Sequence, residues 1–180
     1  NGLKSGKWIS FSIDGKKIRE FSFYMDKRNG DELKYYINGN IESINYYIND
    51  SLEGTSYMYY NNEKIKTKGQ HSKGKKTGKQ KYFDKEGHVV KEENYKENSK
   101  EGKEITYRKD GTIITESEYK NNEKAGSAIE YDSLGKIVTV EEFENGFLAN
   151  TQKLNRLDED GKKTGKWIDY YENGNIKTEG

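Results

Sequence analysis

Residues 30–47 read GDELKYYINGNIESINYY, a glycine followed by two short segments in which apolar or aromatic residues alternate with polar ones. The same plan returns every 24 residues along most of the chain. A glycine opens each copy, at Gly6, Gly30, Gly54, Gly78, Gly102, Gly126 and, after a longer gap, Gly165. An aromatic ring follows five positions later, at Phe11, Tyr35, Tyr59, Phe83, Tyr107, Tyr131 and Tyr170. Self-similarity at a fixed period of this length is typical of repeat architectures, so the chain is a tandem repeat.

Each copy predicts two strands joined by a tight turn, when positions are numbered from the glycine as zero. Apolar residues at positions three and five indicate a half-buried strand. Position nine is glycine in six of seven copies, Glu63 being the exception, and position eleven is β-branched in all copies except the first, which has Lys17. A three-residue loop ending in a left-handed glycine would place positions five and eleven on one face. We expect the rings at positions five and seventeen to share that face.

These features predict an all-β fold, an elongated antiparallel β-meander of tandem 24-residue hairpin repeats. Gly126 and Gly165 are 39 residues apart instead of 24. We therefore divide the chain into a six-copy array at 1–149, an insertion or array boundary at 150–164, and a seventh, truncated copy at 165–180. Since the sequence starts inside a turn and stops inside a copy, we expect a piece of a longer protein. It shows no targeting segment, which leaves a cytoplasmic location and export after signal removal both open.

The composition excludes several classes of function. Only 30% of the residues are hydrophobic, against the roughly 45–50% of a compact globular domain, so a thick core is not expected. The 32 basic and 31 acidic side chains nearly cancel, whereas a nucleic-acid-binding protein needs a basic stripe. There is no cysteine, which excludes disulfides and thiolate catalysis. The apolar runs are too short for a membrane-spanning helix.

Residues 165–180, GKWIDYYENGNIKTEG, and the opening Gly6-Lys7-Trp8 resemble the MORN-repeat variant found in bacterial proteins that are commonly labelled as antitoxins. The resemblance implies a β-repeat sheet that acts in protein association or, by analogy with eukaryotic MORN proteins, in contact with membranes. Tryptophan at position two is kept only as Trp8 and Trp167. Some lipid kinases also carry MORN repeats, so a kinase label can spread through the repeat alone. No kinase motif is present in this sequence.

The sequence gives little support to catalysis or to a cofactor. The two histidines, His71 in the second aromatic column and His88 after a turn glycine, are predicted to lie on opposite rims and to share no metal ion. Glutamates are frequent on the second strands, but a single sheet layer offers no cleft for a pair of catalytic carboxylates. We therefore expect no enzyme, no cofactor and no metal site. An enzyme of unknown chemistry is the alternative hypothesis.

Positions two, four, six and sixteen are predicted to face away from the ring-bearing core. In copies one to four this face is aromatic, whereas in copies five and six it is charged. Tyrosine, tryptophan and methionine are enriched at interfaces, so we predict a site for a protein partner formed by Trp8, Tyr36, Tyr46, Met58, Tyr60 and Tyr82. A membrane-surface role is a further alternative, in which anionic lipid would contact Lys73, Lys75, Lys76 and Lys79. The same group of lysines is also expected in a turn that is exposed to solvent and binds no ligand.

Overall fold

A computed structural model describes residues 2–170 and 176–180 of the chain. The chain divides into two compact units, unit 1 (Asn1–Lys100) and unit 2 (Glu101–Gly180). The described residues form strands and turns without any helix, and none of them offers a helix able to cross a membrane. Within each unit, the paired strands are antiparallel and mostly consecutive along the chain. The predicted all-β meander of hairpin repeats is therefore confirmed.

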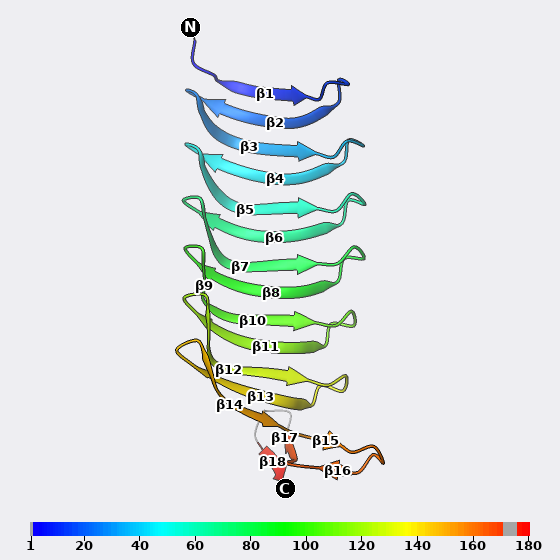
Figure 1. Cartoon of the computed structure of the whole chain (residues 1–180). Coiled ribbons are helices and arrows are strands. Elements are labelled where there is room, and N and C mark those ends of the chain that lie inside the picture. Colours follow the sequence, from blue (N-terminus) through cyan, green and yellow to red (C-terminus); the bar gives the residue numbers. More distant parts are fainter. Residues whose placement is uncertain (1, 171–175) are drawn as a thin grey trace. The chain divides into compact units, whose positions relative to one another are not determined.

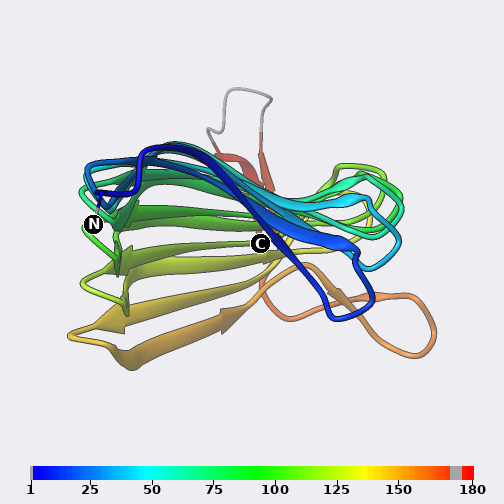
Figure 2. The same cartoon turned by 90° about the horizontal axis from the view of Figure 1, so that it is seen from above.

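Unit 1 is a meander in which each strand pairs with the next one along the chain (Figure 1). Seen along the array, its strands follow curved paths (Figure 2). The strands are β1 (Gly6–Phe11), β2 (Lys17–Tyr24), β3 (Lys27–Tyr35), β4 (Ile41–Ile48), β5 (Ser51–Tyr59), β6 (Ile65–Ser72), β7 (Lys75–Phe83), β8 (Val89–Lys96) and β9 (Ser99–Lys100), the last a short strand paired with β8.

Unit 2 continues the same plan and then departs from it. Its meander consists of β10 (Gly102–Tyr107), β11 (Ile113–Lys120), β12 (Glu123–Tyr131), β13 (Ile137–Glu144) and β14 (Phe147–Lys153). Two small hairpins follow, formed by β15 (Arg156–Leu157) with β16 (Lys163–Thr164) and by β17 (Ile168–Tyr170) with β18 (Ile176–Glu179). The division at 150 and 165 remains a prediction, and part of the seventh copy lies outside the described residues.

The loop inside the hairpin has three residues in copies one to six, as predicted from the sequence. In copy one, the Gly15 N–H donates to the Ser12 carbonyl over 3.0 Å, and the Ser12 N–H donates to the Lys16 carbonyl over 2.8 Å. Gly15 adopts a φ of 79°, and Glu63 adopts a φ of 65° at the same position. A type I turn followed by a left-handed residue produces this pattern. Position nine therefore needs left-handed backbone, which glycine supplies without steric cost.

The turns between copies have a different geometry, which the sequence analysis did not identify. Two consecutive residues take positive φ, such as Met25 (50°) with Asp26 (66°) and Asn121 (52°) with Asn122 (71°). Two-residue hairpin loops of this kind match the twist of the flanking strands and favour asparagine, aspartate and glycine. The signal was present, because positions nineteen and twenty are rich in these residue types.

The glycine at position zero marks a bulge within a strand. Gly30 has a φ of 107°, and a Cβ atom added there would lie 3.0 Å from the Ser22 Cβ. The register between β2 and β3 shifts at this place, between Phe21 and Phe23. A bulge with positive φ explains why one glycine returns every 24 residues.

A second bulge, at position twelve, corrects the predicted faces of the sheet. Tyr35 pairs with Ile41 but Lys34 pairs with Ser43, so Glu42 is an additional residue in β4. One additional residue reverses the alternation of side chains. Directly paired residues share a face of the sheet. Position seventeen is therefore on the same face as positions two, four, thirteen, fifteen and twenty-two. We call this face the pocket face. Positions one, three, five, fourteen and sixteen form the back face. The prediction that all rings share one face is wrong.

Buried side chains in unit 1 are largely polar. Glu20, on the back face, is only 5% exposed and accepts hydrogen bonds from the Lys17 ammonium over 2.5 Å and the Tyr35 hydroxyl over 3.0 Å. Lys17, with a lesser contribution from Lys7, lowers the pKa of Glu20 to about 2. The Lys17 ammonium also lies 4.3 Å from the centre of the Tyr35 ring. These contacts explain why copy one has lysine at position eleven.

Candidate binding site on unit 1

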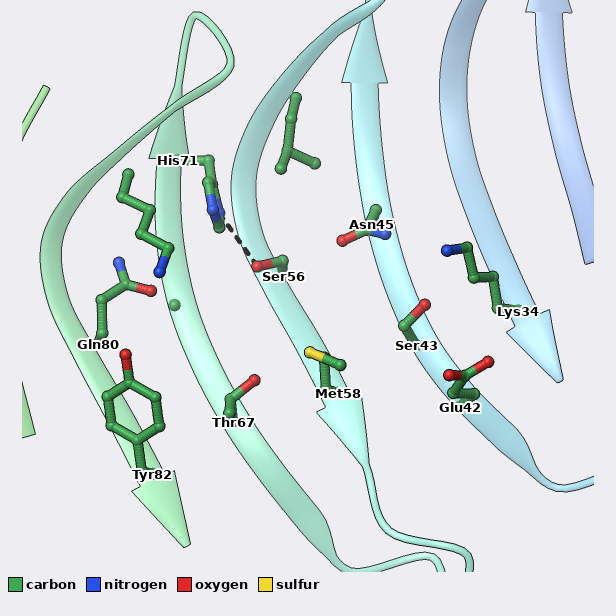
Figure 3. A pocket seen from close by; sticks show the side chains of 13 residues that line it. Lys34, Glu42, Ser43, Asn45, Ser56, Met58, Thr67, His71, Gln80 and Tyr82 are labelled. Atoms are coloured by element: carbon green, nitrogen blue, oxygen red, sulfur yellow. Dashed lines mark hydrogen bonds between the residues drawn. The ribbon is translucent and has the colours of Figure 1, made fainter. Parts of the chain in front are cut away.

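A pocket of about 350 Å³ lies on the pocket face of unit 1. Lys34 comes from β3, Ser56 and Met58 from β5, and Tyr82 from β7, and their side chains project from the same side of the strands (Figure 3). The remaining lining residues are Glu42, Ser43, Asn45, Leu52, Thr67, Gly69, His71, Lys76 and Gln80. The lining is therefore mainly hydroxyl, amide and charged groups around one thioether and one phenol ring.

The pocket is located in copy three because small residues face each other there. Gly69 stands at position fifteen, where copy one has Phe21, and pairs with Ser56. A Cβ atom at Gly69 would lie 1.8 Å from the Gln80 Oε1. The Gln80 side chain occupies this space and donates hydrogen bonds to the carbonyls of Gln70 and Thr77 over 3.0 and 3.2 Å. The absence of a side chain at Gly69 thus lets Gln80 lie across β6, and both residues line the pocket.

One row of residues, alternately at positions four and thirteen, crosses the pocket. Register pairs Lys34 with Ser43, Ser43 with Met58, and Thr67 with both Met58 and Tyr82. Met58 is 42% exposed. The Tyr82 hydroxyl donates to Glu93 over 2.7 Å, and burial together with this carboxylate raises the pKa of Tyr82. The phenol group is thus fixed from one side while its ring lines the pocket.

His71 lies at the end of the pocket where β6 meets β7. Its Nδ1 is 3.1 Å from the Ser56 hydroxyl oxygen. Burial lowers the pKa of His71, and the nearby Lys76 ammonium lowers it further. A serine nucleophile needs an imidazole that a third group orients, which is usually a carboxylate. Because a cation acts on His71 instead, this pair does not have the arrangement of a hydrolase.

The charges in the pocket and beside it are unequally compensated. Glu32 is 2% exposed and forms an ion pair with Arg19, and its Oε2 accepts a hydrogen bond from the Asn45 amide over 3.2 Å. By contrast, Lys34 and Lys76 form no ion pair within the described part of the chain, and the Lys76 ammonium lies 5.1 Å from the centre of the Tyr95 ring. Two lysines that have no ion pair in the described ranges thus line the pocket together with Glu42.

The structure distributes the six predicted partner-binding residues over three environments. Trp8, Met58 and Tyr82 lie on the pocket face, since each pairs with a residue of that face. Tyr46 pairs with Asp31 and Glu53 and lies on the back face. The predicted common face is therefore wrong for Tyr46, because the bulge at position twelve changes the side of every later residue in the strand. Partner binding by the residues of the pocket face stays a prediction, and Tyr46 is not part of that face.

Tyr36 and Tyr60 link consecutive copies at the hairpin ends. The Tyr36 hydroxyl donates to the Tyr59 carbonyl over 2.6 Å, and the Tyr60 hydroxyl donates to the Phe83 carbonyl over 2.7 Å. In unit 2, Arg108 stands at the same position and donates to the Tyr131 carbonyl over 2.7 Å. In copies two, three and five, position six therefore carries a donor that joins one hairpin to the next.

The four lysines proposed for lipid contact do not form a uniform cluster. Lys75 pairs with Glu97 over 3.2 Å, and Lys79 pairs with Glu92 over 2.7 Å. Lys73 occupies the turn with a φ of 50°, whereas Lys76 lines the pocket. Only part of their charge is thus available to an anionic surface.

One group of possible metal ligands, which the sequence analysis did not find, lies in the hairpin turn between β7 and β8. Donor atoms of Asp84, Glu86 and His88 lie within 4.8 Å of one another. Asp84 Oδ1 accepts the backbone N–H groups of Glu86, Gly87 and His88 over 2.8–3.0 Å, and Oδ2 lies 3.0 Å from His88 Nδ1. The hydrogen bonds of the turn therefore explain why these three side chains lie close together without a metal ion. Glu86 and His88 are exposed.

Unit 2 has a smaller pocket, of about 200 Å³, at the corresponding positions. Its charged lining residues are three glutamates and one lysine: Glu104, Glu130, Glu141 and Lys124. The Lys124 ammonium lies 3.8 Å from Glu141. Ala128 takes position two and Ser117 takes position fifteen, and both are buried. The same face is thus predominantly acidic in unit 2.

The comparison with protein families agrees with this repeat plan. The sequence model of the MORN repeat variant family matches at four tandem positions, residues 52–73, 76–97, 100–121 and 163–180. The first two matches span β5 to β8, which contribute most of the pocket lining in unit 1. None of the curated proteins compared with the chain matches it. The chain thus carries tandem repeats similar to the MORN variant.

Proposed function

We propose that this protein is a non-catalytic repeat scaffold that binds another protein through the pocket face of unit 1. The observation that carries the proposal is the pocket itself, in which exposed Met58 and the ring of Tyr82 stand among hydroxyl and amide groups. Methionine and tyrosine are enriched at interfaces, where an apolar centre surrounded by polar groups is the usual arrangement. MORN repeats are in general non-catalytic repeats, which supports a scaffold over an enzyme.

The resemblance to repeats labelled as antitoxins indicates which partner to test first. A toxin protein encoded next to the gene would be captured through the pocket face. The alternative roles have weaker support. A membrane-surface module would depend on lysines of which two are already paired with glutamates, and an enzyme would need a reactive group that His71 and Ser56 do not provide.

Two substitutions of matched exposure test the proposal. Met58 on the pocket face is 42% exposed, and Tyr46 on the back face of the same unit is 43% exposed. Each is changed to glutamate in the intact chain, and binding to the protein captured by the wild type is measured by calorimetry. Met58→Glu should abolish binding because it places a charge in the apolar centre of the interface, whereas Tyr46→Glu should leave binding within about twofold. Far-UV circular dichroism checks the fold of both variants. Equal losses, or binding that survives Met58→Glu, would reject the assignment.

A further inference from the structure

The charges at the two ends of the pocket carry information about its occupant. Lys34 on β3 and Lys76 on β7 line the pocket, and neither ammonium forms an ion pair among the described residues. Most other lysines near this face are neutralised: Lys91 and Lys100 contact Glu93 over 2.8 and 3.0 Å. Lys34 and Lys76 are only partly exposed. Cations held in such a position interact more strongly with an anion than cations free in solvent do.

Between these two ends, the pocket lining contains hydroxyl groups that can donate hydrogen bonds to a carboxylate, and apolar side chains that can contact an apolar side chain of a ligand. The hydroxyls of Ser43, Ser56 and Thr67 line it, with Met58 on the central strand β5 and Tyr82 on β7. Its single carboxylate, Glu42, belongs to β4, the strand that pairs with the β3 strand of Lys34. The arrangement is complementary to a ligand that has negative charge toward both ends and an apolar group between them.

The spacing of the lysines determines what kind of ligand fits. β3 and β7 are separated by four strand intervals, which correspond to about 19 Å across the strands. The two lysines also differ in position along the strands, because the row of Lys34 reaches β7 at Tyr82 and not at Lys76. One carboxylate or phosphate cannot contact two ammonium groups so far apart, even when both side chains lean toward the centre. An extended peptide advances about 3.3 Å per residue, so roughly six residues cover this span.

Resting on the proposed function, we infer that the pocket of unit 1 binds an extended acidic segment of the partner protein, with acidic residues at Lys34 and Lys76 and an apolar side chain over Met58. The segment crosses strands β3 to β7 of unit 1. A protein segment fits better than a membrane, because the two lysines line a hollow of the sheet surface whereas lipid headgroups contact groups that protrude. Three glutamates make the corresponding pocket of unit 2 repulsive to the same segment.

Fluorescence anisotropy with synthetic peptides tests this inference without the natural partner. The probe is the fluorescein-labelled peptide Gly-Glu-Glu-Ser-Leu-Ser-Glu-Glu-Gly, added to the full chain in low salt. The matched probes replace every glutamate by glutamine or by lysine. The acidic peptide should bind at least about tenfold more tightly than the glutamine peptide, since charge-assisted hydrogen bonds are lost in the latter. Raising the salt concentration from about 50 to about 300 mM should weaken binding severalfold.

Single-lysine variants locate the interaction. Lys34→Gln and Lys76→Gln should each weaken binding of the acidic peptide by about fivefold to tenfold, while Lys76→Arg retains it. Lys85→Gln is the matched control, because it removes one positive charge from an exposed turn of unit 1 outside the pocket. In NMR spectra, the imidazole signals of His71 should shift on peptide addition, whereas those of His88, outside the pocket lining, should not.

The outcomes separate this inference from the proposed function. Equal binding of the glutamate and glutamine peptides, no binding of the acidic peptide up to millimolar concentration, or an equal effect of Lys85→Gln would overturn the inference. If Met58→Glu still abolishes capture of the natural partner in that case, the scaffold function stands and its partner segment is not acidic. Binding to vesicles of phosphatidylserine and phosphatidylcholine that is lost in Lys34→Gln, without peptide binding, would assign the pocket to a membrane instead.

Discussion

The pockets of units 1 and 2 are built by the same repeat positions and have opposite character. In unit 1, Lys34 and Lys76 stand with Met58 and Tyr82, whereas in unit 2 Glu104, Glu130 and Glu141 stand with Lys124. Turns and bulges recur in both, because they depend on glycine and on left-handed residues at fixed positions. The comparison teaches that backbone and binding chemistry are specified by different positions of the repeat. A few positions of the pocket face vary between the units, and these determine the charge and polarity of each pocket.

The largest effect is expected where the shared backbone is broken. Gly30→Val places a β-branched side chain at a φ of 107° and 3.0 Å from the Ser22 Cβ, which should lower the free energy of unfolding of unit 1 by about 2–3 kcal/mol. Gly126→Val in unit 2 meets a φ of 64° and a nearest atom at 3.9 Å, so a loss of about 1–2 kcal/mol is expected.

Chemical denaturation followed by tryptophan fluorescence measures both effects. Trp8 and Trp167 are the two tryptophans of the chain, so each unit has its own reporter once the other tryptophan is changed to phenylalanine. A smaller loss for Gly30→Val than for Gly126→Val would contradict the idea that close packing at Gly30 adds to the backbone requirement.

An intermediate effect is expected at Gly69, where the two pockets differ most. Gly69→Ala forces the Gln80 side chain out of its position, because the new Cβ would lie 1.8 Å from Oε1. The loss of two hydrogen bonds should lower the free energy of unfolding by about 1–3 kcal/mol. Ser117→Ala, at the same repeat position in unit 2, should cost less than about 1 kcal/mol.

A double-mutant cycle isolates the cause of the Gly69 effect. If displacement of Gln80 is responsible, Gly69→Ala should cost nothing further in a chain that already carries Gln80→Ala. Additive losses in denaturation experiments would show that Gly69 is needed for another reason.

Acid should weaken unit 1 through Glu20. The pKa of this carboxyl is lowered from its ordinary 4.5 to about 2, so its ionised form contributes stability above pH 4.5, and that contribution is lost as the pH falls toward 2. Glu20→Gln should lower stability at pH 7 and flatten the decline between pH 4.5 and 2. The measurement is thermal unfolding as a function of pH, reported by Trp8 in the Trp167→Phe chain. An unchanged slope in the variant would remove Glu20 from the explanation.

The smallest effect concerns His71, a group that only the unit 1 pocket contains. Tyr119 and Phe143 stand at the same repeat position in unit 2. Burial and, next, Lys76 lower the pKa of His71 below its ordinary 6.5. NMR titration should therefore show His71 protonating below pH 6.5, and Lys76→Gln should raise its pKa part of the way back. A pKa that does not change in Lys76→Gln would mean that burial alone acts on His71.

The sequence predicted the parts of the fold that depend on period. Seven glycines, alternating strands and left-handed residues at position nine are local features, and the three-residue loop follows from them. The faces were predicted wrongly because a bulge at Glu42 and its counterparts carries no residue type that distinguishes it. For the same reason the sequence predicts Tyr46 on the same face as Met58, whereas the structure has it on the back face. A single additional residue reverses all later side chains, and period alone does not reveal it.

The candidate site was predicted only in part. Met58 and Tyr82 could be selected because aromatic and thioether groups on an exposed face indicate binding. The pocket could not be predicted, because it depends on the absence of a side chain at Gly69 and on the path of Gln80 across β6 and β7. The sequence grouped Lys76 with three nearby lysines as a lipid-binding cluster. In the structure those three lysines lie in the turn or pair with glutamates, whereas Lys76 lines the pocket.

The most direct test of the account uses the two methionines of the chain as reporters. Met58 lines the pocket of unit 1, and Met25 lies in a turn of the same unit, where it is 55% exposed. With ¹³C-methyl methionine in the intact chain, addition of the captured partner protein should shift or broaden the Met58 signal and leave the Met25 signal in place. A saturated complex in which Met58 is unchanged would contradict the claim that the pocket face of unit 1 is the binding surface.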